Sequence, residues 1–162
     1  MAKVKEEKTN VMRTLEQKQV PYTAHTYPSE GGAMDGVSVA AYLGQDPETV
    51  FKTLVAKGAS GQYYVFDIPV ADSLDLKKAA RAVGEKSIAM IAQKELLPLT
   101  GYVHGGCSPV GMKKLFPTVF HETAEILDTI MVSAGKIGFQ VECRPQDLME
   151  LVNATTADII VD

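Results

Sequence analysis

The chain has 162 residues, enough for one domain or at most two small ones, and a chain of this length buries about two-thirds of its unfolded surface. Hydrophobic residues make up 46% of it and charged residues 22%, the composition of an ordinary globular protein. The formal net charge of −4 argues against a strongly basic nucleic-acid-binding domain. Two cysteines without a C-x-x-C motif argue against a disulfide framework.

The first ten residues, "MAKVKEEKTN", are polar and charged and lack the apolar segment of a secretory signal. No apolar run approaches the ~20 residues that a membrane span needs. We therefore expect a cytoplasmic protein with reduced thiols and no membrane association. We also expect residues 1–8 to form a flexible N-terminus.

Hydrophobic periodicity and turn residues divide the rest of the chain into short elements. In chain order, the sequence predicts a helix over 9–19, a strand over 21–27, a loop over 28–36, a helix over 36–43, strands over 50–56 and 63–70, a helix over 72–84, a strand over 86–91, a helix that begins at 93, a loop over 105–111, strands over 118–122, 129–135 and 138–143, a helix over 144–153 and an edge strand over 157–162.

Residues with capping chemistry mark the ends of the predicted helices. The expected N-caps are Thr9 or Asn10, Asp35, and Asp72 or Ser73, and the expected stops are Gly44 and Gly84. Pro98 must interrupt the helix that begins at 93, because proline lacks the N–H that a helix interior needs.

The order of elements predicts the fold class. The runs 50–56 and 63–70 are separated by the turn-rich "KGASGQ" and read as a hairpin. Several neighbouring strands look antiparallel, yet helices are interspersed among them. We therefore predict an α/β or α+β fold, with one domain over 9–162 and a mixed sheet packed by helices.

A lysine stands inside the strand-like run "TVFKTLVAKG". In an alternating strand Lys52 shares one side with Val50 and Leu54, and Thr53 lies on the other. If Lys52 points inward, burial should lower the pKa of its ammonium, and an anionic ligand could keep it charged. Two ordinary readings stay open, namely an edge lysine that discourages aggregation and a side chain that extends to water.

The loop "HGGCSPVG" over 104–111 is a second candidate. Gly105 and Gly106 let backbone N–H groups approach a ligand, and Ser108 adds a hydroxyl. The loop lacks the G-K-[ST] ending of a phosphate-binding P-loop and the G-x-S-x-G of a nucleophile elbow, so a plain structural loop is an equal reading. Cys107 is either a nucleophile or a small buried side chain. Ser133 lies where a later strand becomes a turn, a common place for ligand contacts.

The histidines give no sign of a metal site. His25, His104 and His121 are far apart in sequence, and none has a ligand partner at a recognisable spacing. We expect neither a metal nor a cofactor.

Taken together, the motifs resemble the YbaK/EbsC family. "HTY" near residue 26, "VFKTLV", "DLKKAA", "TGYVHGGCSPVGMKK", "VSAGKIGFQVE" and "PQDL" follow one another in the order and spacing of that family, from about residue 9 to the C-terminus. The sequence departs from the pattern at Cys107, where relatives often have an aliphatic residue, and at Ala134, where glycine is common.

The resemblance implies a single α/β domain with a mixed, barrel-like sheet, similar to the editing domain of prolyl-tRNA synthetases. It also implies the site. The essential lysine of the family corresponds to Lys52 and its neighbour to Thr53, the tyrosine of "HTY" to Tyr27, the first loop glycine to Gly105 and the serine of the later turn to Ser133. Gly106 and Ser108 belong to the same implied substrate-binding loop.

The activity that the resemblance implies is trans-editing, the removal of cysteine from mischarged Cys-tRNA(Pro). In the implied mechanism the cysteinyl thiol attacks its own ester, so the protein supplies orientation and oxyanion stabilisation rather than a nucleophile. The implied partners are the acceptor end of tRNA and prolyl-tRNA synthetase. Two alternatives remain, an Ala-tRNA(Pro) deacylase that uses water and a non-catalytic module that binds aminoacyl ends.

Overall fold

The computed structural model describes residues 7–162, so the expected flexible terminus over 1–8 falls mostly outside the described residues. In chain order, the elements are α1 (Asn10–Gln17), β1 (Thr23–Thr26), α2 (Gly36–Tyr42), the 3-10 helix η1 (Pro47–Thr49), β2 (Phe51–Gly58), β3 (Tyr63–Pro69), α3 (Leu76–Val83), β4 (Ile88–Met90), α4 (Gln93–Thr100), β5 (Thr118–His121), the 3-10 helix η2 (Glu122–Ile126), β6 (Ile130–Ser133), β7 (Phe139–Cys143), α5 (Pro145–Leu151) and β8 (Thr155–Ala157). None of the helices in this part of the chain is long and apolar enough to cross a membrane.

Local capping signals fix most helix ends. The side chains of Thr9 and Asp35 accept hydrogen bonds from backbone N–H groups in the first turns of α1 and α2, as predicted. Gly84 ends α3 in the left-handed conformation, also as predicted. The expected cap at Asp72 or Ser73 is wrong. Asp72 lies in a turn, where its N–H donates to the carbonyl of Pro69, and the carbonyl of Ser73 accepts from the N–H of Val161, so α3 begins only after its N-cap, Asp75.

Pro98 does not interrupt α4, contrary to expectation, and the helix continues to Thr100. The missing N–H would have bonded to the carbonyl of Lys94, four residues earlier. Lys94 is exposed, so that carbonyl can bond to water instead. Only two residues of α4 follow Pro98, and Gly101 then ends the helix in the left-handed conformation.

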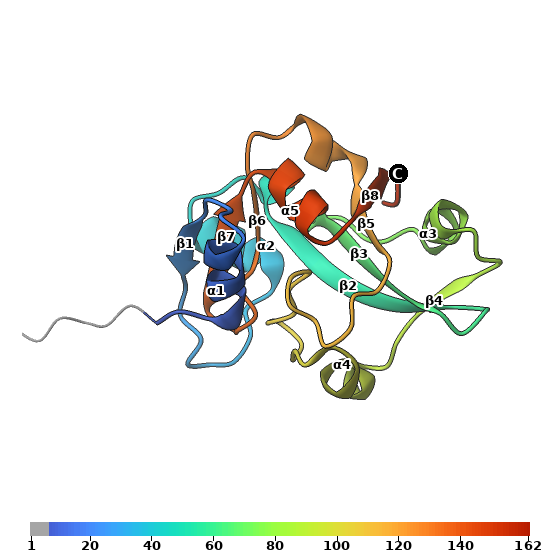
Figure 1. The fold of residues 1–162 in the computed structure, drawn as a ribbon, viewed down its shortest axis with the longest axis horizontal. Coiled ribbons are helices and arrows are strands. Elements are labelled where there is room, and N and C mark those ends of the chain that lie inside the picture. Colours follow the sequence, from blue (N-terminus) through green and yellow to red (C-terminus); the bar gives the residue numbers. More distant parts are fainter. Residues whose placement is uncertain (1–6) are drawn as a thin grey trace, which may run out of the picture.

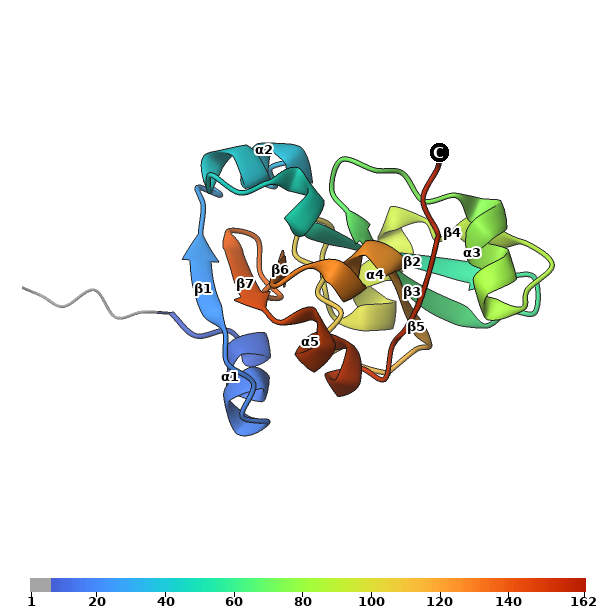
Figure 2. The ribbon, with the colours of Figure 1, turned by 90° about the horizontal axis from the view of Figure 1, so that it is seen from above.

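The strands form two sheets (Figures 1 and 2). The smaller sheet has the order β1-β7-β6 and is antiparallel. The larger sheet has the order β4-β2-β3-β5-β8 and is mixed, since β3–β5 and β5–β8 are parallel pairs. Figure 2 shows α1 and α2 at opposite ends of β1. The mixed α+β architecture agrees with the prediction.

The expected barrel-like sheet is not closed. β4 pairs with only the last three residues of β2, and β1 and β8 remain edge strands. A parallel bridge between Val50 and Met131 connects the two sheets at one point. The predicted edge strand at the C-terminus exists but lies earlier, at β8, and beyond it Ile160 forms a single bridge with Leu74.

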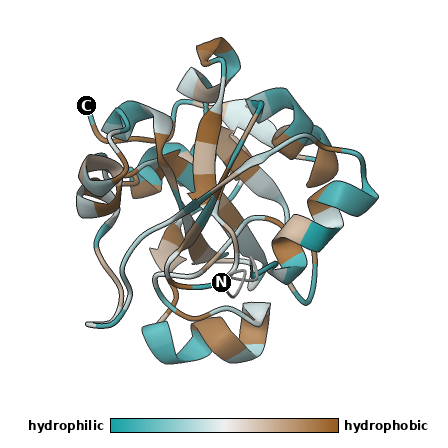
Figure 3. Ribbon diagram, turned by 90° about the vertical axis from the view of Figure 1, so that its left-hand side faces the viewer, coloured by the Kyte–Doolittle hydropathy of each residue, from teal (hydrophilic) through white to brown (hydrophobic). Residues whose placement is uncertain are grey.

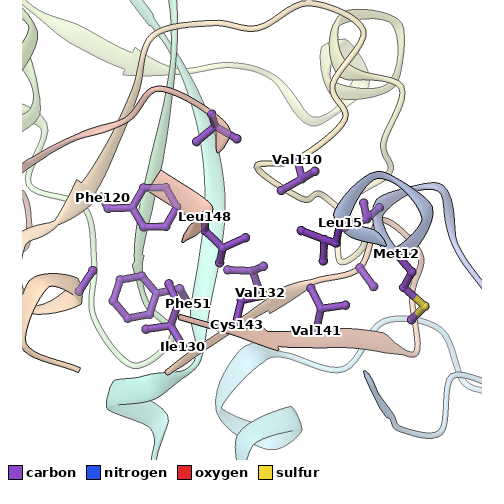
Figure 4. Close-up of a cluster of buried hydrophobic side chains, with 14 residues drawn as sticks. Met12, Leu15, Phe51, Val110, Phe120, Ile130, Val132, Val141, Cys143 and Leu148 are labelled. Atoms are coloured by element: carbon purple, nitrogen blue, oxygen red, sulfur yellow. The ribbon is translucent and has the colours of Figure 1, made fainter. Parts of the chain in front are cut away.

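The main core lies between the two sheets, α1 and α5 (Figure 4). Leu15 of α1, Val132 and Val141 of the smaller sheet and Leu148 of α5 are fully buried there, and Phe51 and Phe120 of the larger sheet stack with ring centres 6.3 Å apart. The opposite face of the larger sheet packs against α3 in a second cluster. In Figure 3 the hydrophobic colour concentrates on the central strands, while the outer helices carry both colours.

The packing predicts a large cost for truncating Leu148, whose side chain is completely buried. Leu148→Ala should lower the free energy of unfolding by about 2–5 kcal/mol in urea titrations, because it leaves a cavity in the main core. Leu115→Ala is the matched control, since Leu115 is 58% exposed and its truncation should have little effect. Equal losses for the two variants would contradict this assignment of the core.

Candidate active site

The first half of β2 forms a ladder with β3 alone, and on its other side β6 meets the chain only at the bridge from Val50 to Met131. The N–H of Val70 donates to the carbonyl of Val50 over 2.8 Å, so even-numbered residues of β2 bond to β3 in the antiparallel ladder. The odd-numbered residues direct their backbone groups the other way, where Ile91 donates to the carbonyl of Val55. β4 pairs only from Ala56 onward, and the backbone of Thr53 therefore points toward an open sheet edge.

A cavity of about 310 Å³ lies along this edge. Strands, loops and the start of α2 contribute to its wall. The lining residues are Tyr27, Met34, Asp35, Gly36, Val37, Val39, Val50, Phe51, Lys52, Thr53, Leu54, Val70, Leu96, His104, Gly105, Cys107, Ser133 and Gln140. Gly36 lets the start of α2 come close, because a Cβ there would lie 2.5 Å from the side chain of Val70.

Five of the seven residues singled out in the sequence line this cavity: Tyr27, Lys52, Thr53, Gly105 and Ser133. Gly106 and Ser108 are buried behind the loop and do not line it. The backbone of Gly106 packs against the turn between β6 and β7, where a Cβ would lie 3.1 Å from the nitrogen of Ile137. The hydroxyl of Ser108 accepts a hydrogen bond from the N–H of Val110 and so holds the loop in shape.

Lys52 is half-buried in the wall of the cavity. Its Nζ donates to the carbonyl oxygen of Val70 over 3.3 Å. Burial lowers the pKa of its ammonium, and the carboxylate of Asp72 partly opposes that shift. Within residues 7–162 no carboxylate oxygen lies within 4.0 Å of Nζ, so two of its three N–H groups remain for a ligand.

Asp67 lies behind Thr53 and escaped the sequence analysis. The two residues are cross-strand partners, and Thr53 Oγ1 lies 2.6 Å from Asp67 Oδ1. Asp67 is completely buried, and its Oδ2 has no hydrogen-bond partner among the described residues. Burial raises the pKa of this carboxyl to about 8, with the Thr53 hydroxyl opposing the shift. An aspartate within the apolar run "YYVFDIPV" was the available signal, since aspartate is depleted in strands.

Gln140 is a second polar residue that the sequence analysis did not single out. It is buried on β7 opposite Ser133 and lines the cavity, and its Oε1 has no partner in the described part of the chain. The hydroxyl of Ser133 accepts from the N–H of Gly135, which fixes the start of the turn. The backbone of Tyr27 is held beside this turn, since its N–H donates to the carbonyl oxygen of Gly138 over 2.9 Å.

The thiols are poorly suited to nucleophilic attack. Burial raises the pKa of Cys107 to about 12, and the carboxyl of Asp67 adds to that shift. Burial raises the pKa of Cys143 to about 12 as well, and this residue packs in the main core. Residues 7–162 contain no group of three or more His, Cys, Asp or Glu side chains arranged to hold a metal ion.

A larger hollow of about 580 Å³ lies elsewhere, beside Tyr64, Thr118 and Asn153. The described residues that line it include no charged side chain. The smaller cavity is lined by the half-buried Lys52, the backbone of Gly105, the unpaired amide oxygen of Gln140 and the Thr53 hydroxyl that bonds to Asp67. A catalytic site is recognised by such polar groups rather than by its volume, so we select the smaller cavity.

Comparisons with known proteins identify relatives over nearly the whole chain. Residues 31–151 match the family described as "Aminoacyl-tRNA editing domain". A protein of Enterococcus faecalis (strain ATCC 700802 / V583), named "Putative Cys-tRNA(Pro)/Cys-tRNA(Cys) deacylase EbsC", is 44% identical over 160 residues, which are 98% of each chain.

Solved structures share the fold. The "Crystal structure of a putative trans-editing enzyme for prolyl tRNA synthetase" is 25% identical with a TM-score of 0.80, covering 94% of this chain and 95% of that one. The crystal structure of a hypothetical protein, 21% identical, has a TM-score of 0.84 and covers 93% of this chain and 99% of that one, which shows the fold alone.

The burial of Asp67 predicts a pH-dependent effect on stability. Its pKa is higher in the folded chain than in the unfolded chain, so its contribution to stability is lost as pH rises from about 4 to 8. Asp67→Asn removes the titration. The free energy of unfolding of this variant, relative to the unsubstituted protein, should therefore increase with pH by up to about 1.4 kcal/mol per unit.

Urea unfolding at pH 5, 6, 7 and 8 measures this difference. Asp128→Asn is the control, because Asp128 is exposed and its substitution should shift the unfolding free energy by a similar small amount at each pH. A difference between Asp67→Asn and the unsubstituted protein that stays constant over this range would show that Asp67 is ionised in the folded chain.

Proposed function

The chain belongs to the aminoacyl-tRNA editing domain family, and we propose that it is a trans-editing enzyme that hydrolyses cysteine from mischarged Cys-tRNA(Pro). The relative named as a Cys-tRNA(Pro)/Cys-tRNA(Cys) deacylase supports this activity through 44% identity over 98% of both chains. The proposed reaction takes place in the cytoplasm, where aminoacyl-tRNAs are made and used.

The observation that carries the proposal is the half-buried Lys52 in the cavity wall. Its ammonium has one backbone carbonyl as partner and lies in a site whose burial strengthens electrostatic attraction. An aminoacyl-tRNA end offers two anionic or partly anionic groups, the terminal phosphate and the ester carbonyl oxygen. Lys52 donates hydrogen bonds either to the phosphate or to the ester carbonyl oxygen. Both cases place an oxygen atom of the ligand at the mouth of the cavity.

The proposed chemistry is assisted by the substrate. The thiol sulfur of the cysteinyl group attacks the ester carbonyl carbon, and a C–S bond forms. The C–O bond to the 3′ oxygen then breaks, a cyclic thioester leaves, and the thiol proton ends on the 3′ oxygen of the adenosine. The high pKa values of Cys107 and Cys143 are consistent with a protein that provides no thiolate of its own.

The remaining residues receive roles that suit their positions. Backbone N–H groups near Gly105 and at Thr53 stabilise the oxyanion that develops on the ester carbonyl. Tyr27 and Ser133 also line the cavity, and we assign them the orientation of the aminoacyl end. Gly106 and Ser108 lie behind this surface, and we assign them the support of the loop rather than substrate contact.

The partner in the proposed function is prolyl-tRNA synthetase. The chain carries a formal net charge of −4, so its own attraction to the tRNA phosphates is weak. A synthetase that has just mischarged the tRNA would supply the binding energy and deliver the acceptor end.

A panel of aminoacyl-tRNAs tests the substrate. Purified protein should release cysteine from Cys-tRNA(Pro) and leave Ala-tRNA(Pro) intact, because alanine has no thiol to attack the ester. The measurement is the loss of labelled aminoacyl-tRNA with time, with and without prolyl-tRNA synthetase. Cys-tRNA(Cys) completes the panel and tests whether the tRNA body matters. Rapid release of alanine would instead establish the water-dependent alternative.

Substitution of Lys52 tests the site. Lys52→Ala should lower kcat/KM for Cys-tRNA(Pro) by about 100-fold or more, since it removes a cation from a partly dry site. The melting temperature should change little, because the substitution also removes a desolvated charge. Lys57→Ala is the matched control on the same strand, where the lysine is exposed. Full activity of Lys52→Ala would refute the assignment of Lys52.

A further inference from the structure

The hydrogen bond between Thr53 and Asp67 connects the cavity to a completely buried carboxyl group. Thr53 lines the cavity, and Asp67 lies behind it with Oδ1 at 2.6 Å from Thr53 Oγ1. A hydroxyl has one hydrogen, so the direction of this bond decides what Thr53 presents to a ligand. If Thr53 donates to Asp67, it faces the cavity as an acceptor. If Asp67 donates to Thr53, the hydroxyl hydrogen is free to point into the cavity.

The second oxygen of Asp67 determines where a proton would reside. Oδ2 has no hydrogen-bond partner among the described residues. A proton on Oδ2 would leave a buried O–H donor without an acceptor, whereas a proton on Oδ1 is shared with Thr53 and leaves only an unpaired carbonyl oxygen. Unpaired carbonyl oxygens are tolerated better than unpaired donors in protein interiors. Thr53 donates to the ionised carboxylate. When Asp67 is protonated, the proton on Oδ1 reverses this bond, and the carboxyl donates to Thr53.

The surroundings of Asp67 favour the protonated form at neutral pH. Thr53 faces it from β2, and Phe120 is its partner on β5. Cys107 faces it from the glycine loop as the titratable neighbour, and its thiol is neutral over the working range because burial raises the thiol pKa to about 12. Lys52 lies on the other side of β2 by the alternation of the strand. Burial without a cationic partner raises the pKa of Asp67 to about 8.

We propose that Asp67 is a positioning residue that sets the direction of the Thr53 hydroxyl during the reaction. The protonated carboxyl donates to Thr53 Oγ1, and Thr53 then donates its own hydrogen to the ester carbonyl oxygen as negative charge develops there. When Asp67 is ionised, the Thr53 hydroxyl donates to the carboxylate instead. Thr53 then presents only its lone pairs to the oxyanion and cannot stabilise it. This inference rests on the proposed deacylase function and adds a second oxyanion donor beside the backbone.

The test is the pH profile of single-turnover deacylation of Cys-tRNA(Pro) between pH 6.5 and 9.5. Asp67→Asn places an amide that can donate to Thr53 at every pH in this range. The rate of the unsubstituted protein divided by that of Asp67→Asn should fall about tenfold or more from pH 7 to pH 9.5. This ratio cancels the pH dependence of the ester and of the cysteinyl thiol, which both proteins share.

Thr53→Val provides a second readout that leaves Asp67 in place. Its rate at pH 7 should be about tenfold or more below that of the unsubstituted protein, because valine has no hydroxyl to donate. The difference between the two rates should narrow toward pH 9.5, where the hydroxyl of the unsubstituted protein donates to Asp67 instead of the substrate. Thr53→Ser keeps a hydroxyl and should keep the pH dependence of the unsubstituted protein. Circular dichroism melting curves verify that each variant is folded.

The outcomes separate this inference from the proposed function. If the unsubstituted protein does not deacylate Cys-tRNA(Pro), the proposed function fails and this inference fails with it. If the protein is active but the ratio to Thr53→Val is the same at pH 7 and pH 9.5, the proposed function stands and the role of Asp67 is overturned. A constant ratio to Asp67→Asn, where that variant folds, overturns it equally.

Discussion

The incomplete pairing of β2 is the constraint on which the site depends. β3 covers the whole strand on one side, while β4 covers only Ala56–Gly58 on the other. A fully paired β2 would use the backbone of Thr53 in a ladder and leave no edge for a ligand. The start of α2, the glycine loop and the turn after β6 close around this edge, and the bridge from Val50 to Met131 holds the smaller sheet beside it.

Local chemistry accounts for the parts of the fold that the sequence predicts well. Thr9, Asp35 and Gly84 act within one helical turn of their own positions, so their effects are visible in a short window. The hairpin of β2 and β3 is also local. The parallel pair of β3 and β5 joins segments about 50 residues apart, and no nearby residue specifies it. The barrel-like sheet was implied by the family resemblance and not by local patterns, and the two sheets are open.

The site was predicted unevenly for a related reason. Lys52 was noticed because a charge in an apolar strand is unusual, and Asp67 has the same signature in the next strand. The pairing of β2 with β3 makes Asp67 important, because only the register places it behind Thr53. Gly105 and Ser133 were noticed as turn residues that could contact a ligand, and Tyr27 was selected through the family resemblance. None of the three has a local pattern that predicts a shared cavity with Lys52.

We propose that the cavity beside Lys52 and Thr53, rather than the larger uncharged hollow beside Tyr64 and Thr118, receives the aminoacyl end. A crystal structure with a non-hydrolysable analogue, 3′-deoxyadenosine carrying cysteine through a 3′ amide, tests it most directly. The cysteinyl group should lie inside this cavity, with a ligand oxygen about 3 Å from Lys52 Nζ. An analogue bound in the larger hollow, with Lys52 still bonded only to Val70, would contradict it.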